Sequence, residues 1–319
     1  MKEIEFTAID GIKVGHMQDE EAATGCSVII CKNGATSGVD VRGGSPATRE
    51  TDLLNPVNMV QQIHAIVLSG GSAYGLDSCS GVMKYLEEKD IGFDVQVAKV
   101  PIVCGACLFD LVIGSPKVRP DLEMGYKAAQ NANNRSCPNG NIGAGCGATV
   151  GKYLGPEFSM KGGLGTYAIQ VGDLQVGAIV AVNCLGDVID PEDNNKILAG
   201  MIKDNEFMDT EKIMISNYHD RTNLFSGNTT IGAIVTNAKF DKSEITKIAS
   251  MTHNGYGRTM RPAHSIYDGD TIFAMSTGDV EADLSVVGML AANVMEKAVV
   301  QAIKNADTLH GVKAYKDLK

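Results

Sequence analysis

Three short segments carry side chains that are able to do chemistry. Asn228-Thr229-Thr230 leads into an apolar run typical of a strand, where a hydroxyl can be held rigidly and still be reached as a nucleophile. Asp268-Gly269-Asp270 is a turn before another strand-like run, and its two carboxylates could orient a nearby cation. Lys161 stands before two glycines. Each pattern taken alone is also typical of an ordinary turn or of a solvated surface lysine.

Two glycine-rich segments could expose backbone N–H groups. The segment from Ser69 to Gly75 runs from a strand-like run into a helix, and N–H groups at a helix N-terminus suit an anion. It has neither the spacing and lysine of a P-loop nor a dinucleotide-binding pattern, so a structural tight turn is favoured over a pocket wall of backbone donors. The second segment, Gly140 to Ala148, is dense enough in glycine to imply backbones in close approach.

The six histidines and eight cysteines form no recognisable catalytic or metal-binding pattern. The histidines lie far apart, none belongs to a GxSxG motif, and His64 and His253 are expected to be structural. Cys104 and Cys107 form a CxxC pair, but no second pair or histidine follows at ligand spacing. The sequence therefore predicts buried, reduced thiols and no metal.

Composition limits the classes of partner and location. The 319 residues include 28 Lys plus Arg against 38 Asp plus Glu, for a net charge of −10, and no basic run is interleaved with aromatics. This argues against a nucleic-acid or anionic-membrane partner. The charged start lacks the apolar core of a secretory signal, and the apolar stretch from Val100 to Gly114 is too short to span a membrane. We expect a cytoplasmic protein.

Strand-like and helix-like runs alternate along the whole chain. The helical runs are expected from Leu76 to Lys89, from Asp241 to about His253 with a capping box at its start, and from Leu284 to Ala306. The strand-like runs are Cys26 to Cys31, Ala65 to Leu68, Phe93 to Val97, Tyr167 to Val171, Val176 to Val182, Thr230 to Thr236 and Thr271 to Met275. A single sheet this wide would be unusual, so we expect an α/β or α+β sandwich of two sheets covered by helices.

Taken together, the segments resemble one family over nearly the whole chain. The matching segments are Val39 to Gly44, Ser69 to Leu76, Val100 to Val103, Leu108 to Asp110, Gly143 to Gly145, Lys161 to Gly165, Ala181 to Asn183, Asn228 to Gly232 and Asp268 to Thr271. This ordered set resembles the P1 family peptidases, which include the L-aminopeptidase/D-esterases, β-peptidyl aminopeptidases and nylon-oligomer hydrolases.

The resemblance implies a four-layer αββα sandwich of one domain that cuts itself to create an N-terminal nucleophile. The cut would fall between Asn228 and Thr229, leaving a large fragment of residues 1–228 and a small fragment of residues 229–319. Most aminopeptidase members have a Gly-Ser junction, and the Asn-Thr junction here is closer to that of the nylon-oligomer hydrolases.

The resemblance also implies a role for each site residue. Thr229 would supply the nucleophilic hydroxyl, and its freed α-amine, with an unperturbed pKa of about 7.7–8.0, would act as general base. A positive Lys161 nearby would lower the pKa of that amine. Asn183 would donate to the oxyanion, and Asp268 and Asp270 would orient the amine and the lysine.

Three further expectations complete this interpretation. Before the amine exists, self-cleavage needs another activator, either Lys161 or a water. Backbone donors around Gly71, Ser72 and Tyr74 are weaker candidates for substrate contacts. Thr230 or nearby backbone could complete the oxyanion site.

The predicted activity is hydrolysis of a small peptide or amide, without a cofactor, by a homo-oligomer such as the tetramers common in the family. The nearest alternative is an acyltransferase similar to the ornithine acetyltransferases, which would share the acyl-threonine intermediate and differ only in the acceptor. A non-catalytic scaffold with the same fold is the alternative from another class. It would leave the chain uncut and would tolerate Thr229→Ala.

Overall fold

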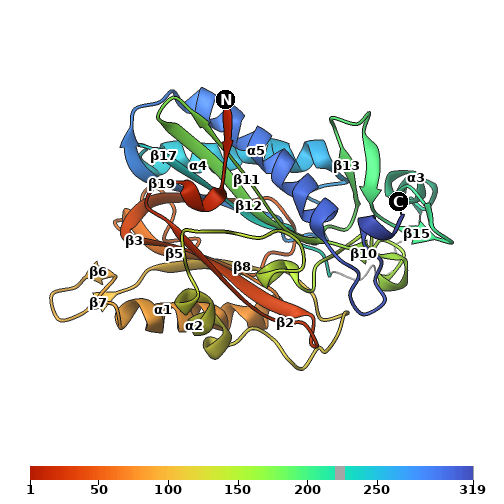
Figure 1. Cartoon of the computed structure of the whole chain (residues 1–319), viewed down its shortest axis with the longest axis horizontal. Coiled ribbons are helices and arrows are strands. Elements are labelled where there is room, and N and C mark those ends of the chain that lie inside the picture. The colour runs from red at the N-terminus through yellow and green to blue at the C-terminus, as the bar shows by residue number, and fades with distance from the viewer. Residues whose placement is uncertain (220–226, 319) are drawn as a thin grey trace.

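The computed structural model describes residues 1–219 and 227–318, and these form four layers (Figure 1). In the view of Figure 1, α4 and α5 cover the upper strands, and α1 and α2 cover the lower strands. The α-helices of the described residues are α1 (Ser78–Glu87), α2 (Leu122–Gln130), α3 (Thr210–Ser216), α4 (Lys242–Thr259) and α5 (Leu284–Asn305). The predicted mixed α/β sandwich is confirmed.

The large sheet has ten strands among the described residues, in the order β1-β11-β12-β17-β19-β3-β5-β8-β4, with β2 paired to β3. Its members are β1 (Lys2–Ile4), β2 (Lys13–Asp19), β3 (Thr24–Val41), β4 (Thr48–Arg49), β5 (Gln62–Ser69), β8 (Val103–Cys107), β11 (Gly163–Val171), β12 (Leu174–Val182), β17 (Ile231–Ala238) and β19 (Thr271–Val280). Short strands outside it are β6 (Phe93–Asp94), β7 (Lys99–Val100), β9 (Thr149–Val150), β10 (Met160–Lys161), β13 (Asp187–Asp190), β14 (Lys196–Ala199), β15 (Ile202–Lys203), β16 (Glu206–Phe207) and β18 (Met260–Arg261).

The strand β3 carries the sheet from one layer to the other. Its first part pairs with β2 and β5, whereas its last part, from Thr36 to Val41, pairs with β19. The pairing with β5 shifts register between Ile30 and Ala35, where Gly34 has a φ of +80°. The expectation of two separate sheets is therefore wrong in one respect, because one long bent strand joins both layers by hydrogen bonds.

Three apolar clusters fill the spaces between the four layers. One lies between the strands β11, β12, β17 and β19 and the helices α4 and α5, a second lies between the two strand layers, and a third lies beneath α1 and α2. α5 packs closely on β11, because a Cβ at Gly165 would come within 2.0 Å of the Ala298 carbonyl oxygen. α5 is long and apolar enough to cross a membrane by length and composition, but 67% of that window is buried inside the fold, as in a core helix.

Local sequence signals located several elements. The capping box at the start of α4 is present, with Asp241 and Glu244 each accepting from the other's backbone N–H. The run from Phe93 to Val97, by contrast, forms only the two-residue strand β6 of a hairpin with β7. Its apolar side chains are exposed, so alternation there does not reflect a core. All eight cysteines are buried, which confirms the prediction of buried thiols, and none of them is joined to another in a disulfide.

Candidate active site

The pairing of β12, β17 and β19 brings three loop segments to the same end of the sheet. Ala181 pairs with Ile231 across an antiparallel ladder, and Ile231 pairs with Thr271 across a parallel one. Two residues beyond these pairs, the same register sets Asn183, Thr229 and Gly269 side by side. The Thr229 N–H donates to the Asn183 carbonyl oxygen at 3.0 Å, so the structure brings these predicted residues together.

The peptide bond between Asn228 and Thr229 is buried in this row. The Thr229 hydroxyl lies against the Asn228 carbonyl oxygen, to which it donates a short hydrogen bond. The same oxygen accepts from the Gly269 N–H at 3.1 Å. A Cβ at Gly269 would lie 2.7 Å from Thr229 Oγ1, so this close approach requires glycine. The hydroxyl and a backbone donor therefore converge on one carbonyl group.

The Asn183 side chain is fully hydrogen-bonded in the described chain. Its Oδ1 accepts from the Thr149 N–H at 2.9 Å and from Lys152 Nζ at 2.8 Å. Its Nδ2 donates to the carbonyl oxygens of Phe109 at 3.0 Å and Gly227 at 3.3 Å. One of its two N–H donors is thus held by the residue just before the Asn228-Thr229 pair.

Lys152, which the sequence did not single out, lies at the centre of the site. Its ammonium group is buried and donates to the carbonyl oxygen of Asn183 at 3.1 Å, to Asn183 Oδ1 and to the Gly227 carbonyl oxygen at 3.0 Å. Burial lowers the pKa of Lys152 to about 7, although the Asp268 carboxylate acts in the opposite direction. This lysine is therefore able to change protonation state near neutral pH.

Lys161 is completely buried, so its interpretation as a solvated surface lysine is wrong. All three of its N–H donors are used by backbone carbonyl oxygens: Gly145 at 3.0 Å, Ala148 at 2.9 Å and Gly162 at 3.0 Å. Burial lowers the pKa of Lys161 to about 8. With its donors committed to the glycine-rich turn, Lys161 holds that turn closed, and the contacts with Asn183 come from Lys152 instead.

The two predicted carboxylates are buried at the turn before β19. Asp268 accepts from the Leu185 N–H at 3.2 Å and from the Ser265 hydroxyl. Burial and the neighbouring Asp270 raise the pKa of Asp268, with hydrogen bonds and Lys152 opposing the shift. Asp270 Oδ1 accepts from the Thr230 N–H at 2.9 Å and so fixes the backbone that follows Thr229.

His264 is a second residue that sequence reasoning missed. Its Nδ1 and its backbone N–H both lie 2.9 Å from Asp270 Oδ2, so it holds the far side of the carboxylate that binds Thr230. His264 has a positive φ of 58°. No sequence pattern marks this residue, because its contact with Asp270 depends on the turn between them. As expected, His64 and His253 instead contact the backbone of Ile102 and Asp40.

The turn around Gly71 binds an anion that belongs to the chain itself. The Gly71 N–H donates to Asp110 Oδ1 at 2.7 Å, and the Thr24 hydroxyl donates to Asp110 Oδ2 at 2.7 Å. Ser72 donates its N–H to the Leu108 carbonyl oxygen at 2.9 Å. The turn therefore braces the segment whose next carbonyl, at Phe109, binds Asn183.

Tyr74 lies apart from this row. Its side chain is exposed, and the Arg119 guanidinium lies 3.9 Å from the centre of its ring. Within residues 1–219 and 227–318, no group of three or more His, Cys, Asp or Glu side chains is arranged to hold a metal ion.

Comparison with known proteins identifies the family. The profile of peptidase family S58 matches residues 5–316. The chain belongs to peptidase family S58. It is 36% identical to an uncharacterized aminopeptidase of Mycobacterium leprae, over 97% of this chain and 92% of that protein. It is 30% identical to a 6-aminohexanoate-oligomer endohydrolase of Kocuria sp., over 92% of this chain and 84% of that protein.

The fold of this S58 peptidase is similar to that of the L-aminopeptidase D-Ala-esterase/amidase from Ochrobactrum anthropi, described as a variant of the Ntn-hydrolase fold. The TM-score is 0.70 at 18% identity, over 95% of this chain and 86% of that one. These matches confirm the resemblance inferred from the ordered motifs. The S58 peptidase is an enzyme that hydrolyses peptide or amide bonds.

Proposed function

We propose that this S58 peptidase cuts itself between Asn228 and Thr229 and then uses Thr229 as an N-terminal nucleophile on small peptides or amides. The observation that carries the proposal is the convergence of the Thr229 hydroxyl and the Gly269 N–H on the Asn228 carbonyl group. Attack on that carbonyl requires a nucleophile next to the carbonyl group and a donor for its oxygen, and these two contacts supply both.

The proposed self-cleavage has two steps, an acyl shift from nitrogen to oxygen and the hydrolysis of the resulting ester. Thr229 Oγ bonds to the carbonyl carbon of Asn228, the bond from that carbon to the Thr229 nitrogen breaks, and the hydroxyl proton passes to the nitrogen. Water then hydrolyses the resulting ester, which leaves the Asn228 carboxylate on fragment 1–228 and a free amine and hydroxyl on Thr229. The Gly269 N–H stabilises the charge that develops on the Asn228 oxygen in both steps.

Cleavage also frees the donors that a substrate needs. In the intact chain the Gly227 carbonyl oxygen accepts from both Lys152 Nζ and Asn183 Nδ2. When the end of the large fragment withdraws, these two donors lose an acceptor and become available to a substrate carbonyl oxygen. The Thr229 amine then takes the hydroxyl proton, and the Lys152 charge favours the free-base form of that amine.

The names of the relatives suggest which substrates to test. One relative is an aminopeptidase and another is a 6-aminohexanoate-oligomer endohydrolase, so the assay includes L-aminoacyl p-nitroanilides and linear 6-aminohexanoate oligomers. We further propose a homo-oligomer in the cytoplasm, where the eight free thiols would stay reduced. Light scattering after size exclusion measures the assembly.

The deciding experiment is mass spectrometry and N-terminal sequencing of the purified chain and two matched variants. Wild type is expected to yield fragments 1–228 and 229–319, and Thr229→Ala is expected to remain intact and inactive. Thr230→Ala serves as the control, because its hydroxyl hydrogen-bonds to Met260 Sδ at 3.4 Å and its backbone N–H keeps the bond to Asp270, and it is expected to be cut. An active wild-type chain in which residues 228 and 229 stay joined would refute the proposal.

A further inference from the structure

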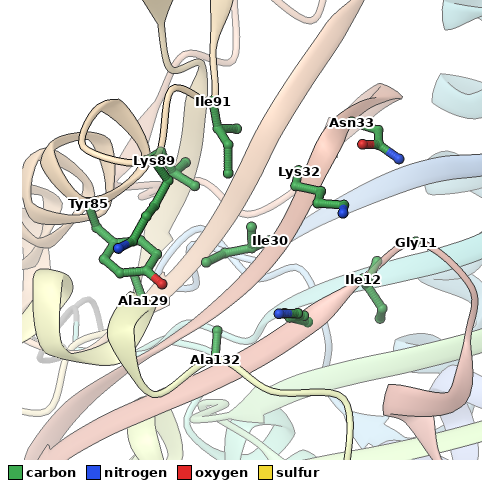
Figure 2. A pocket seen from close by; sticks show the side chains of 12 residues that line it. Gly11, Ile12, Ile30, Lys32, Asn33, Tyr85, Lys89, Ile91, Ala129 and Ala132 are labelled. Carbon is green, nitrogen blue, oxygen red and sulfur yellow. The ribbon is translucent and has the colours of Figure 1, made fainter.

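One pocket lies away from the candidate active site and shares no residue with it. It has a volume of about 380 Å³ and lies between α1, the end of α2, and the strands β2 and β3. Figure 2 shows Lys32 and Asn33 on one side of this pocket and Tyr85 and Lys89 on the other. The helices α1 and α2, which contribute to its lining, form the lower helical layer of Figure 1.

The inner wall of the pocket is apolar. Ile12 and Leu86 are buried, Ile91 is half-buried, and Ile30 and Ala132 lie between the two sides in Figure 2. A cavity of about 150 Å³ is enough to hold a benzene ring. The volume of 380 Å³ therefore leaves room for an apolar body about twice that size, such as two rings or a chain of medium length.

The mouth of the pocket is positively charged on a protein whose net charge is −10. Lys13, Lys32 and Lys89 all line it, all are exposed, and none forms an ion pair with any described residue. Lys89 Nζ lies 5.6 Å from the centre of the Tyr85 ring, so this charge lies close to an apolar surface that also lines the pocket. Asp90, the next residue, is paired with Lys99 at 2.7 Å and does not neutralise this rim.

We propose that this pocket binds a small amphipathic carboxylate. Its apolar body would lie against Ile30, Ile12 and Tyr85, and its carboxylate would pair with a lysine that lines the pocket, Lys32 on one side or Lys89 on the other. The apolar wall argues against an inorganic anion, which would gain nothing from it, and the three cations argue against an organic cation.

Isothermal titration calorimetry of the purified full-length protein with decanoate tests the proposal. Two probes serve as comparisons: acetate has the carboxylate without the body, and decyltrimethylammonium has the body with the opposite charge. We expect one decanoate to bind per chain at least tenfold more tightly than either comparison. A decanoate affinity no better than that of acetate or of the cation would overturn the proposal.

Variants locate the site. The double variant Lys32→Gln/Lys89→Gln is expected to weaken decanoate binding at least tenfold, and Ala132→Leu, which fills the pocket without changing charge, is expected to weaken it as well. Lys117→Gln/Lys196→Gln removes the same charge from exposed, unpaired lysines that do not line the pocket, and it should bind as wild type does. Equal weakening by both double variants, or full affinity in Ala132→Leu, would show that the pocket is not the site.

Discussion

Replacing Lys152 with methionine tests whether the charge of this lysine controls the basicity of the Thr229 amine. Lys152 Nζ and the Thr229 nitrogen both donate to the Asn183 carbonyl oxygen, at 3.1 and 3.0 Å, so the two nitrogens lie within about 6 Å of each other. At an effective dielectric constant of about 20, two unit charges about 6 Å apart repel by about 2.8 kcal/mol. That energy changes the protonation equilibrium of the amine about a hundredfold.

The expected signature is a loss of activity that depends on pH. In acid, where Lys152 is charged, Lys152→Met should lower amide hydrolysis by up to about a hundredfold, because less of the Thr229 amine is in the free-base form. Above about pH 9 the amine is deprotonated in both proteins, so the loss that comes from the amine should disappear and only the pH-independent loss of the Lys152 donor should remain. The acid limb of the kcat/KM profile should therefore move to higher pH in the variant.

The fold should tolerate this change. The Asn183 carbonyl keeps the Thr229 N–H, Asn183 Oδ1 keeps the Thr149 N–H, and the Gly227 carbonyl keeps Asn183 Nδ2. No buried acceptor loses its last donor, so the cost is about 1–3 kcal/mol at most. Removal of the buried charge offsets part of this cost. Because the pKa of Lys152 is lowered from 10.5 to about 7 in the folded protein, the free energy of unfolding of wild type increases as the pH rises from about 7 to 10.5. The free energy of unfolding of the variant should lack this increase.

The assay measures initial rates on fully processed protein from pH 5 to 9.5. If Lys152→Met is not cut, the two fragments are co-expressed, with the small fragment released from a tag so that it begins at Thr229. Lys161→Met is the matched control, because Lys161 donates only to backbone carbonyls, and its profile should keep the wild-type shape. An unchanged acid limb in Lys152→Met, or a shift seen only in Lys161→Met, would refute the assignment.

Three further predictions concern the neighbours of this lysine. Gly269→Ala should slow self-cleavage at least tenfold on a time-course gel, because its Cβ would come within 2.7 Å of Thr229 Oγ1; cutting at the wild-type rate would remove Gly269 from the mechanism. His264→Gln should lower kcat about tenfold through loss of the Nδ1 bond to Asp270 while the melting temperature stays within a few degrees, and a normal kcat would make His264 merely structural. Burial raises the pKa of Asp110 to about 6 from 3.8, so wild-type stability is lost as the pH rises through that interval; the melting temperature of Asp110→Asn relative to wild type should therefore increase by several degrees between pH 4 and 7.5, and a constant difference would contradict this.

The sequence predicted the architecture and most of the row around Thr229, for a physical reason. Asn183, Thr229 and Asp268 each follow or precede a strongly apolar strand, and strands of this kind can hardly be placed anywhere except inside a sheet. Once β12, β17 and β19 are neighbours, their register brings the three segments together. The sequence did not predict that the long strand β3 joins the two strand layers, because nothing in its sequence shows where its pairing partners change.

No sequence pattern could show that Lys152, and not Lys161, contacts Asn183. Lys161 lies in a conspicuous glycine motif, whereas Lys152 lies between Gly151 and Tyr153 without any such mark. Their positions are decided by the pairing of β9 with β10, which sets Lys161 opposite Thr149. That pairing directs the Lys161 ammonium to the Gly145–Ala148 turn and leaves Lys152, in the loop after β9, to reach Asn183.

The strand order has a consequence for the lifetime of the enzyme. β17 and β19, both downstream of the proposed cut, are inserted as a pair between β12 and β3, both upstream of it. The two fragments of a cut chain would thus stay associated through the hydrogen bonds of this sheet. After thermal unfolding, however, the fragments would have to reassociate, and each would expose unpaired strand edges that tend to aggregate. Thermal unfolding, followed by circular dichroism on heating and cooling, should be reversible in the intact Thr229→Ala protein and irreversible in the processed one.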